Sequence, residues 1–282
     1  MKKRRVALVL AGGGARGVAH IGAIEELERQ GFEISAVAGT SMGALVGGVY
    51  ASGYLEPFKE WMRALDKYKV FSLVDFALST EGLVKGDRVM EATKELVPDV
   101  QMERMPVPFA AVAADLLTGD EVVLDSGGLY DAIRASISIP SVFRPVHRDG
   151  RVLVDVGTVN PLPLNRVRRE EGDLLVAVDV SARFGADSVR RANASLNYYK
   201  VLIASSQIMQ QRITQLMCRL YKPDIMVGLP ADSYGMFEFY RSEEILEAGR
   251  AATRAALERL ETDGENGMVF AESEEKIATA RF

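Results

Sequence analysis

Hydrophobic residues near the N-terminus form two short runs, each followed by a glycine-containing turn and then by a helical pattern. Val6 to Ala11 is continuously apolar, which is typical of a strand buried on both faces of a parallel sheet. Apolar residues then recur at helical spacing from Val18 to Leu27. A second strand is predicted at Ile34 to Ala38, followed by a helix of small residues from Ala44 to Tyr50. This order of elements predicts a mostly parallel sheet with helices on both faces.

The rest of the chain carries further strands and helices, with no internal repeat and no long linker. The pattern from Leu55 to Leu96 predicts helices and loops that form a lid or side layer, Asn197 to Leu220 predicts a long amphipathic helix, and Ile245 to Leu260 a final one. We expect a three-layer α/β/α sandwich in one domain, residues 1–261, followed by an acidic flexible tail at 262–282. Further strands are predicted at Phe109–Ala114, Glu121–Leu124, Arg151–Val154, Leu174–Val178 and Asp224–Leu229.

Composition excludes several classes of partner. A net charge of −5 gives no general attraction for nucleic acid. The single cysteine, Cys218, cannot form an internal disulfide, and no set of Cys and His has zinc-ligand spacing, so we expect no metal and no cofactor. Lys2 to Arg5 precede an apolar run too short for a secretory signal, and no stretch of about 18 apolar residues could span a bilayer. We expect a cytoplasmic protein of unknown oligomeric state.

The first glycine turn, Gly12-Gly13-Gly14-Ala15-Arg16-Gly17, fits the G-x-G-x-x-G pattern of dinucleotide-binding proteins. That interpretation also requires an acidic residue at the end of the second strand to hold the ribose. The strand at Ile34 to Ala38 carries no acid and continues directly into Gly39-Thr40-Ser41. The sequence therefore disfavours a dinucleotide site.

The second turn, Gly39-Thr40-Ser41-Met42-Gly43, fits the Gly-x-Ser-x-Gly pattern of an activated serine. A serine on a tight strand-to-helix turn needs small residues two positions before and after it, and Gly39 and Gly43 provide them. Tight helix–strand packing is the alternative explanation of the same glycines. If the first two strands are neighbours, Gly12, Gly13 and Gly14 lie beside Ser41, and their amides would suit an oxyanion hole.

Three residues are candidates for the base that takes the proton of Ser41. His20 falls within the first helix and His147 in a polar hairpin-like segment, and neither has a neighbouring pattern that would orient an imidazole. Asp155 ends an apolar strand and is expected on the same rim of the sheet as Ser41, although a structural Asp that caps the loop has the same pattern. A partly desolvated Asp155 could deprotonate Ser41 in a Ser–Asp dyad, with Gly13 and Gly14 amides binding the oxyanion.

Three segments together resemble the patatin-like phospholipases: Gly12 to Gly17 as the oxyanion loop, Gly39 to Gly43 as the nucleophile elbow, and Asp155-Val156-Gly157 as the acid motif. Further similarity lies in RASISIPSVFRPV, which starts at Arg134 and precedes the acid strand. The resemblance implies a Ser–Asp lipid acyl hydrolase without a metal, with Arg16, Gly17, Gly39, Gly43 and Gly157 in supporting positions. Val156 departs from the family, in which many members have glycine there.

The resemblance also implies an amphiphilic substrate, such as a phospholipid, a lysophospholipid or another acyl ester. The segment from Val70 to Leu78 and the helix from Asn197 to Leu220 could line an acyl channel or contact lipid, and core packing is the alternative use of their side chains. Transient contact with the inner membrane surface is therefore a hypothesis. A second hypothesis for the whole chain is a catalytically idle regulatory protein that binds acyl ligands on the same fold.

Overall fold

A computed structural model describes residues 4–74, 87–140, 143–155, 157, 159–182 and 198–262. The segment expected to form a flexible tail lies outside these residues, apart from Thr262, which ends the last helix. Val156 also lies outside them, as does part of the Val70 to Leu78 segment.

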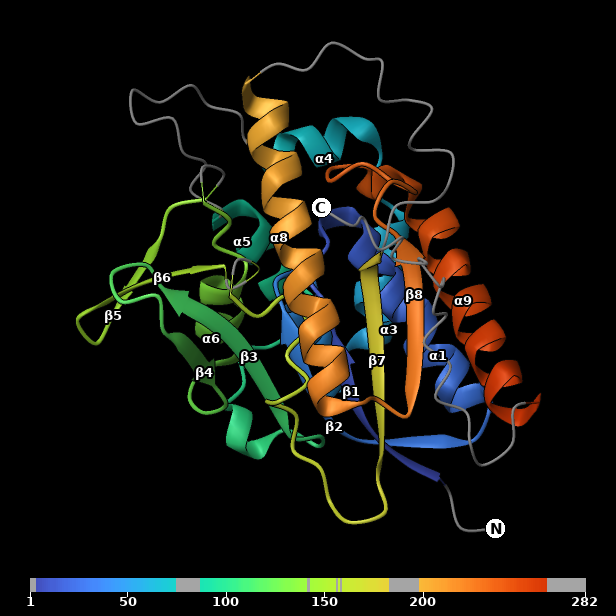
Figure 1. Cartoon of the computed structure of the whole chain (residues 1–282). Helices are drawn as coiled ribbons and strands as arrows, with labels where there is room; N and C mark the ends of the chain where they lie inside the picture. The colour runs from blue at the N-terminus through green and yellow to red at the C-terminus, as the bar shows by residue number, and fades with distance from the viewer. Residues whose placement is uncertain are drawn as a thin grey trace, which may run out of the picture.

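A single mixed sheet forms the centre of the molecule, with the strand order β5-β6-β3-β2-β1-β7-β8 and β4 paired to β3 (Figure 1). The strands at the centre and on the β8 side run parallel to one another. The strands beyond β3 are paired antiparallel. The strands are β1 (Arg4–Leu10), β2 (Phe32–Thr40), β3 (Phe109–Asp115), β4 (Glu121–Leu124), β5 (Val146–Arg148), β6 (Arg151–Asp155), β7 (Leu174–Ala182) and β8 (Ile225–Pro230).

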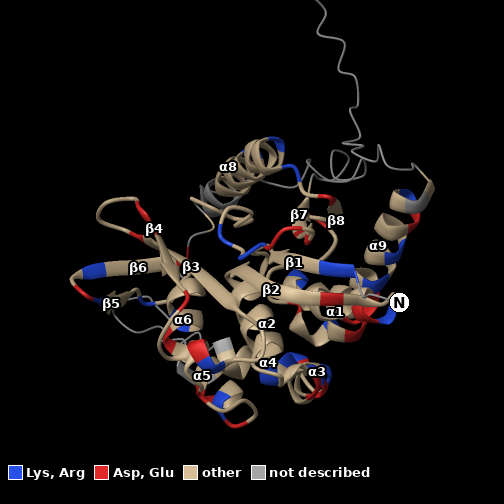
Figure 2. Ribbon diagram, turned by 90° about the horizontal axis from the view of Figure 1, so that it is seen from below, with Lys and Arg blue, Asp and Glu red and all other residues tan. Residues whose placement is uncertain are grey.

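Helices cover both faces of this sheet, so the expectation of a three-layer α/β/α sandwich is confirmed (Figure 2). Most of the helices lie on one face, and α8 lies on the other. On the crowded face are α1 (Ala19–Arg29), α2 (Met42–Ala51), α3 (Leu55–Arg63), α4 (Lys67–Val74), α5 (Asp87–Lys94) and α6 (Leu129–Ser136). The remaining helices are α8 (Tyr198–Tyr221), α9 (Ser242–Thr262), which packs on α1, and the short 3₁₀ helices η1 (Gly14–Val18), η2 (Met102–Arg104) and η4 (Phe239–Arg241).

The central strands are apolar on both faces because each face is covered by helices. In β1, Val6, Leu8 and Leu10 belong to the large core beneath α1 and α2. Val9 belongs to a second core beneath α8, which also contains the buried Cys218. Alternate side chains of one strand therefore enter different cores, which explains the uninterrupted apolar run in the sequence.

The register of β1 and β2 brings their two following turns together. The strands are parallel, and Leu10 pairs with Gly39. The glycine turn after β1 and the serine turn after β2 therefore leave the sheet side by side, at the edge where ligands of parallel sheets bind. The sequence prediction that these strands are neighbours is confirmed.

Candidate active site

Ser41 sits on a sharp turn between β2 and α2. Its backbone has φ 56° and ψ −123°, an unfavourable conformation for a residue with a side chain. The flanking glycines make this turn sterically accessible. A Cβ on Gly39 would lie 2.3 Å from the Gly43 carbonyl oxygen, and a Cβ on Gly43 would lie 2.3 Å from the Leu10 carbonyl oxygen. Such strain is found where a nucleophile is lifted out of a sheet.

Asp155 lies beside Ser41 and forms a side-chain hydrogen bond with it. Its Oδ1 also accepts a hydrogen bond from the Gly157 amide at 2.8 Å. Asp155 is only 7% exposed, and this burial raises its pKa to about 6, against the opposing effects of the two hydrogen bonds. A carboxylate with this pKa is a stronger base than an exposed aspartate and is still ionised at neutral pH.

The strand that carries Asp155 reaches the site in a way that the sequence did not predict. We expected the acid on the same rim because it ends a strand, which assumes that β6 is parallel to β2. Instead, β6 is antiparallel to β3, and Asp155 pairs with Ala113. In β3 the preceding residue, Val112, pairs with Thr40 of β2. Asp155 is therefore level with Ser41 because of the register of β6, not because both end parallel strands.

The glycine turn presents two amides that have no acceptor in the described part of the chain, those of Gly13 and Gly14. The Gly12 amide donates to the Pro161 carbonyl at 3.1 Å, so it is already used. A Cβ on Gly13 would lie 2.4 Å from Val180 Cγ2, and Gly14 has φ 57°. This stretch of backbone thus approaches its neighbours too closely for side chains, and two of its donors remain available.

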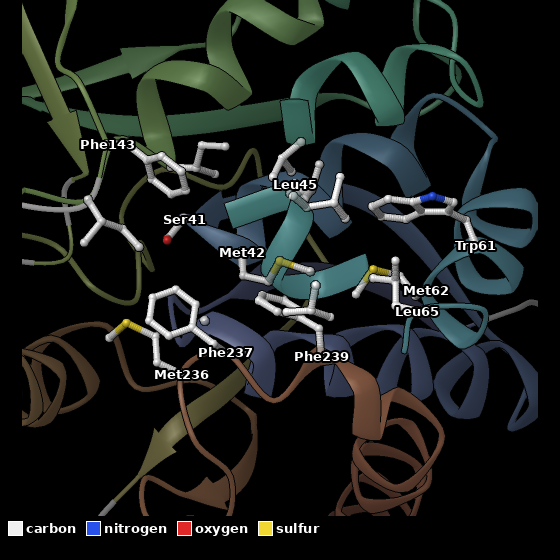
Figure 3. Close-up of a pocket in the computed structure, with 16 residues that line it drawn as sticks. Ser41, Met42, Leu45, Trp61, Met62, Leu65, Phe143, Met236, Phe237 and Phe239 are labelled. Carbon is white, nitrogen blue, oxygen red and sulfur yellow. The ribbon is translucent and has the colours of Figure 1, made fainter. Parts of the chain in front are cut away.

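A largely apolar pocket extends from Ser41 (Figure 3). In this view Ser41 lies at one end of the pocket and Trp61 at the other, with Met42 and Leu45 between them. A pocket of this kind can hold a hydrocarbon chain with its ester group at the serine. The lining residues are Gly14, Ser41, Met42, Leu45, Trp61, Met62, Leu65, Val70, Leu73, Val89, Ile137, Ile139, Phe143, Met236, Phe237 and Phe239.

The family model described as patatin-like phospholipase matches residues 8–167, a stretch that contains the glycine turn, Ser41 and Asp155. The chain belongs to the patatin-like phospholipase family. Among curated proteins, an uncharacterized NTE family protein of Mycobacterium tuberculosis is 44% identical over 177 residues, covering 63% of this chain and 49% of that protein. Another from the same organism is 30% identical over 283 residues, covering 90% of this chain and 47% of that protein.

Patatin-like phospholipase domain-containing protein 7 of Rattus norvegicus is 27% identical over 269 residues, covering 86% of this chain and 20% of that protein. The chain thus spans about half the length of the mycobacterial relatives and 20% of the rat protein. Among solved structures, VipD from Legionella pneumophila matches with a TM-score of 0.48 and 13% identity, covering 92% of this chain and 67% of that one.

Arg16 braces the glycine turn from inside the protein. Its guanidinium donates to the carbonyls of Val180 at 2.8 Å and Tyr234 at 2.9 Å, and to Ser181 Oγ at 3.2 Å. Ser181 Oγ in turn donates to the Gly12 carbonyl at 3.2 Å. Burial lowers the pKa of Arg16, and the nearby Asp179 opposes this effect. Arg16 is therefore a buried side chain that supports the glycine turn.

Gly17 and Gly157 have different structural roles. A Cβ on Gly17 would lie 2.3 Å from Met42 Cγ, so this glycine lets η1 pack against the start of α2. Gly157 contributes the amide that holds Asp155. Both positions support the site through backbone geometry.

Neither histidine is placed to act on Ser41. His20 is fully buried, its Nε2 lies 2.8 Å from the Ala11 carbonyl oxygen, and burial lowers its pKa to about 4. His147 is exposed on β5, at the antiparallel end of the sheet. Asp155 is the titratable side chain that contacts Ser41 among the residues described.

A further residue that positions the elbow has no recognisable pattern in the sequence. Ser136, at the end of α6, accepts the Ser41 amide at 2.9 Å and donates to the Val112 carbonyl at 2.7 Å. It lies in the segment that resembles the family, but a lone serine on a helix gives no signal of this contact. In the part of the chain that the structure describes, the Met42 amide at the first position of α2 also has no hydrogen-bond acceptor, and such a donor often serves an oxyanion hole.

Within the described ranges, no group of three or more His, Cys, Asp or Glu side chains could hold a metal ion. In the same ranges, no helix is both long enough and apolar enough to cross a bilayer.

Proposed function

We propose that the chain is a lipid acyl hydrolase that cleaves carboxylic esters through an acyl-enzyme on Ser41. One observation carries this proposal: a serine in a strained elbow conformation is hydrogen-bonded to a buried carboxylate, at the end of an apolar pocket. Phospholipids, lysophospholipids and related acyl esters have the amphiphilic character that this arrangement would select. The family membership supports the same class of reaction.

In the first step, Asp155 accepts the hydroxyl proton of Ser41 while Oγ attacks the ester carbonyl carbon. The negative charge that develops on the carbonyl oxygen is stabilised by the amides of Gly13 and Gly14. The tetrahedral intermediate then collapses, and the departing alcohol takes the proton from Asp155. Water repeats the sequence on the acyl-enzyme, releasing the fatty acid and restoring Ser41.

The elevated pKa of Asp155 is useful in this scheme because a serine hydroxyl is a much weaker acid than a carboxylic acid. Burial brings the pKa of the carboxyl to about 6 and so reduces that mismatch. Donors fixed before the reaction stabilise the alkoxide and oxyanion without reorganising, and losing one such donor typically lowers the rate about 100- to 1,000-fold. The Arg16 and Ser181 contacts hold the donors in place.

A fluorophosphonate probe followed by peptide mapping tests the assignment of the nucleophile. We expect labelling of Ser41, loss of ester hydrolysis in Ser41→Ala, and a loss of similar size in Asp155→Asn. Equal hydrolysis by wild type and Ser41→Ala would reject the proposal and favour the idle, ligand-binding alternative. Replacing both His20 and His147 with glutamine should leave hydrolysis intact. If the variant folds but no longer hydrolyses esters, a histidine-dependent esterase is favoured.

A further inference from the structure

The outward side of α8 carries large apolar side chains that are about half or more exposed in the described structure. Val201 is 47% exposed, Ile208 54%, Met209 57%, Leu216 62% and Leu220 69%. Ile208 and Met209 are each seven or eight residues from both Val201 and Leu216, and Leu220 is four residues from Leu216. These residues therefore share one side of the helix, and Arg212 and Arg219 lie among them. We call these seven residues the α8 outer face. Clustered exposure of this kind, unlike a single exposed leucine, marks an interaction site.

The charge of this helix differs from that of the rest of the chain. The protein as a whole has a net charge of −5, yet the 24 residues of α8 include no Asp or Glu. In Figure 2 this helix has blue segments and no red one, whereas α9 carries both colours. Arg212 contacts only Gln215, at 3.3 Å, and in the described ranges neither Arg212 nor Arg219 is within ion-pair distance of a carboxylate. Both arginines are therefore available to an anionic partner.

The opposite side of α8 anchors the helix to the sheet. Thr214 and Cys218 are buried there, and Gln211 Nε2 donates to the carbonyls of Ser181 and Ala182 at the end of β7, both at 3.4 Å. The core beneath the helix is thus complete without the outer face. Folding does not account for the exposed apolar residues.

We propose that the α8 outer face is a docking surface for an anionic lipid bilayer. An amphipathic helix with apolar and basic residues on its free side lies in a membrane interface, where the apolar side chains enter the acyl boundary and the arginines meet anionic headgroups. A second copy of the chain fits less well, because two outer faces packed together would bring unpaired arginines against each other. A lipid bilayer suits both the exposed apolar side chains and the two arginines.

The same helix passes close to the candidate site. Gln210 Nε2 lies 3.4 Å from the position that a Cβ on Gly157 would occupy, next to Asp155. Gln210 is four residues before the buried Thr214 and therefore lies on the anchoring side of α8, so the outer face and the candidate site are on opposite sides of this helix. Vesicle binding does not depend on ester hydrolysis, so the two proposals can fail separately.

Flotation with vesicles tests the docking surface. The whole chain carrying Ser41→Ala is used so that lipid is not consumed. We expect binding to phosphatidylglycerol-containing vesicles at low salt, weak binding to phosphatidylcholine vesicles, and release in 0.5 M salt, where charge attraction is screened. Arg212→Gln with Arg219→Gln should weaken binding about 25-fold, because each basic residue near an anionic surface contributes about fivefold. Ile208→Ser with Leu216→Ser and Leu220→Ser should weaken it at least tenfold.

Matched controls replace the same residue types elsewhere. Leu116→Ser with Leu117→Ser removes two leucines that are 58% and 70% exposed after β3, and Arg104→Gln with Arg168→Gln removes two other exposed arginines. Both controls should bind vesicles as the parent does. Absence of binding at low salt, or equal losses in controls and outer-face variants, would overturn the proposal. A concentration-dependent dimer that is lost in the Ile208, Leu216 and Leu220 variant, without any vesicle binding, would identify a second copy as the occupant.

A fluorophore attached at a single site gives a second measurement, which reports contact with vesicles without a variant that weakens vesicle binding. Cys218 is 3% exposed and burial raises the pKa of its thiol to about 12, so it should resist labelling in the folded protein. A polarity-sensitive fluorophore on Met209→Cys should shift to the blue on anionic vesicles, whereas the same dye on Leu117→Cys should not. A shift at Leu117 alone would place the contact elsewhere and refute the assignment of α8.

Discussion

Burying a carboxylate beside the nucleophile has two consequences: the carboxylate becomes a stronger base, and its charge destabilises the folded protein. Replacing Asp155 with asparagine separates them. Burial raises the pKa of Asp155 from 3.8 to about 6, which corresponds to about 3 kcal/mol of lost stability when the group is ionised. Asparagine has nearly the same shape, and its Oδ1 can still accept the Gly157 amide, but it carries no charge. We therefore expect Asp155→Asn to lose ester hydrolysis and yet to unfold less readily than wild type at pH 7.

The sign of this effect depends on pH. Below about pH 3.8 Asp155 is protonated in both folded and unfolded protein, so the variant should have no electrostatic advantage. As the pH rises from about 3.8 to about 6, wild type loses the stability that the protonated form had, and the advantage of the variant should grow by about 3 kcal/mol.

Urea unfolding at pH 4 and pH 7, followed by circular dichroism, measures the difference. Asp149→Asn is the matched control, because its carboxylate is 86% exposed, and it should show no comparable change between the two pH values. The quantity compared is the free energy of unfolding of Asp155→Asn minus that of wild type. If this difference is no larger at pH 7 than at pH 4, the claim that burial destabilises the charge of Asp155 is refuted.

Three further predictions follow from the geometry of the site. Hydrolysis of a short-chain ester should fall about tenfold per pH unit below pH 6, because protonated Asp155 cannot accept a proton, and a flat profile to pH 4 in folded protein would contradict this. Gly43→Ala should destabilise the protein by about 1–3 kcal/mol in thermal unfolding, since its Cβ would lie 2.3 Å from the Leu10 carbonyl oxygen, whereas Gly228→Ala, with 3.5 Å to its nearest neighbour, should change little. Trp61→Ala should lengthen the pocket and so shift the preferred acyl length of an ester series upward, with a gain in kcat/KM of about fourfold for each further methylene accommodated. An unchanged preference would mean that the acyl chain binds elsewhere.

Much of the candidate site could be predicted from the sequence because its central features are local. The turn around Ser41 needs glycines at fixed spacing, and the same steric requirement appears in the structure as two Cβ positions that would overlap backbone atoms. The glycine turn after β1 was placed correctly because the two strands are neighbours in a parallel sheet. Only the structure, however, shows that the Gly12 amide is already paired with Pro161, which leaves Gly13 and Gly14 as the donors of this turn that have no acceptor among the described residues.

The choice of elements follows from the sequence itself. Uninterrupted apolar strands, glycine turns and helical spacing are properties of neighbouring residues, and they determined the α/β class, the order of elements and the identity of Ser41 as a candidate nucleophile. The tertiary structure decided what depends on distant segments meeting. The antiparallel register of β6 sets Asp155 level with Ser41, burial in that position raises its pKa, and Ser136 and Arg16 fix the loops on either side. No local pattern specifies these contacts, because each joins residues that only the folded sheet brings together.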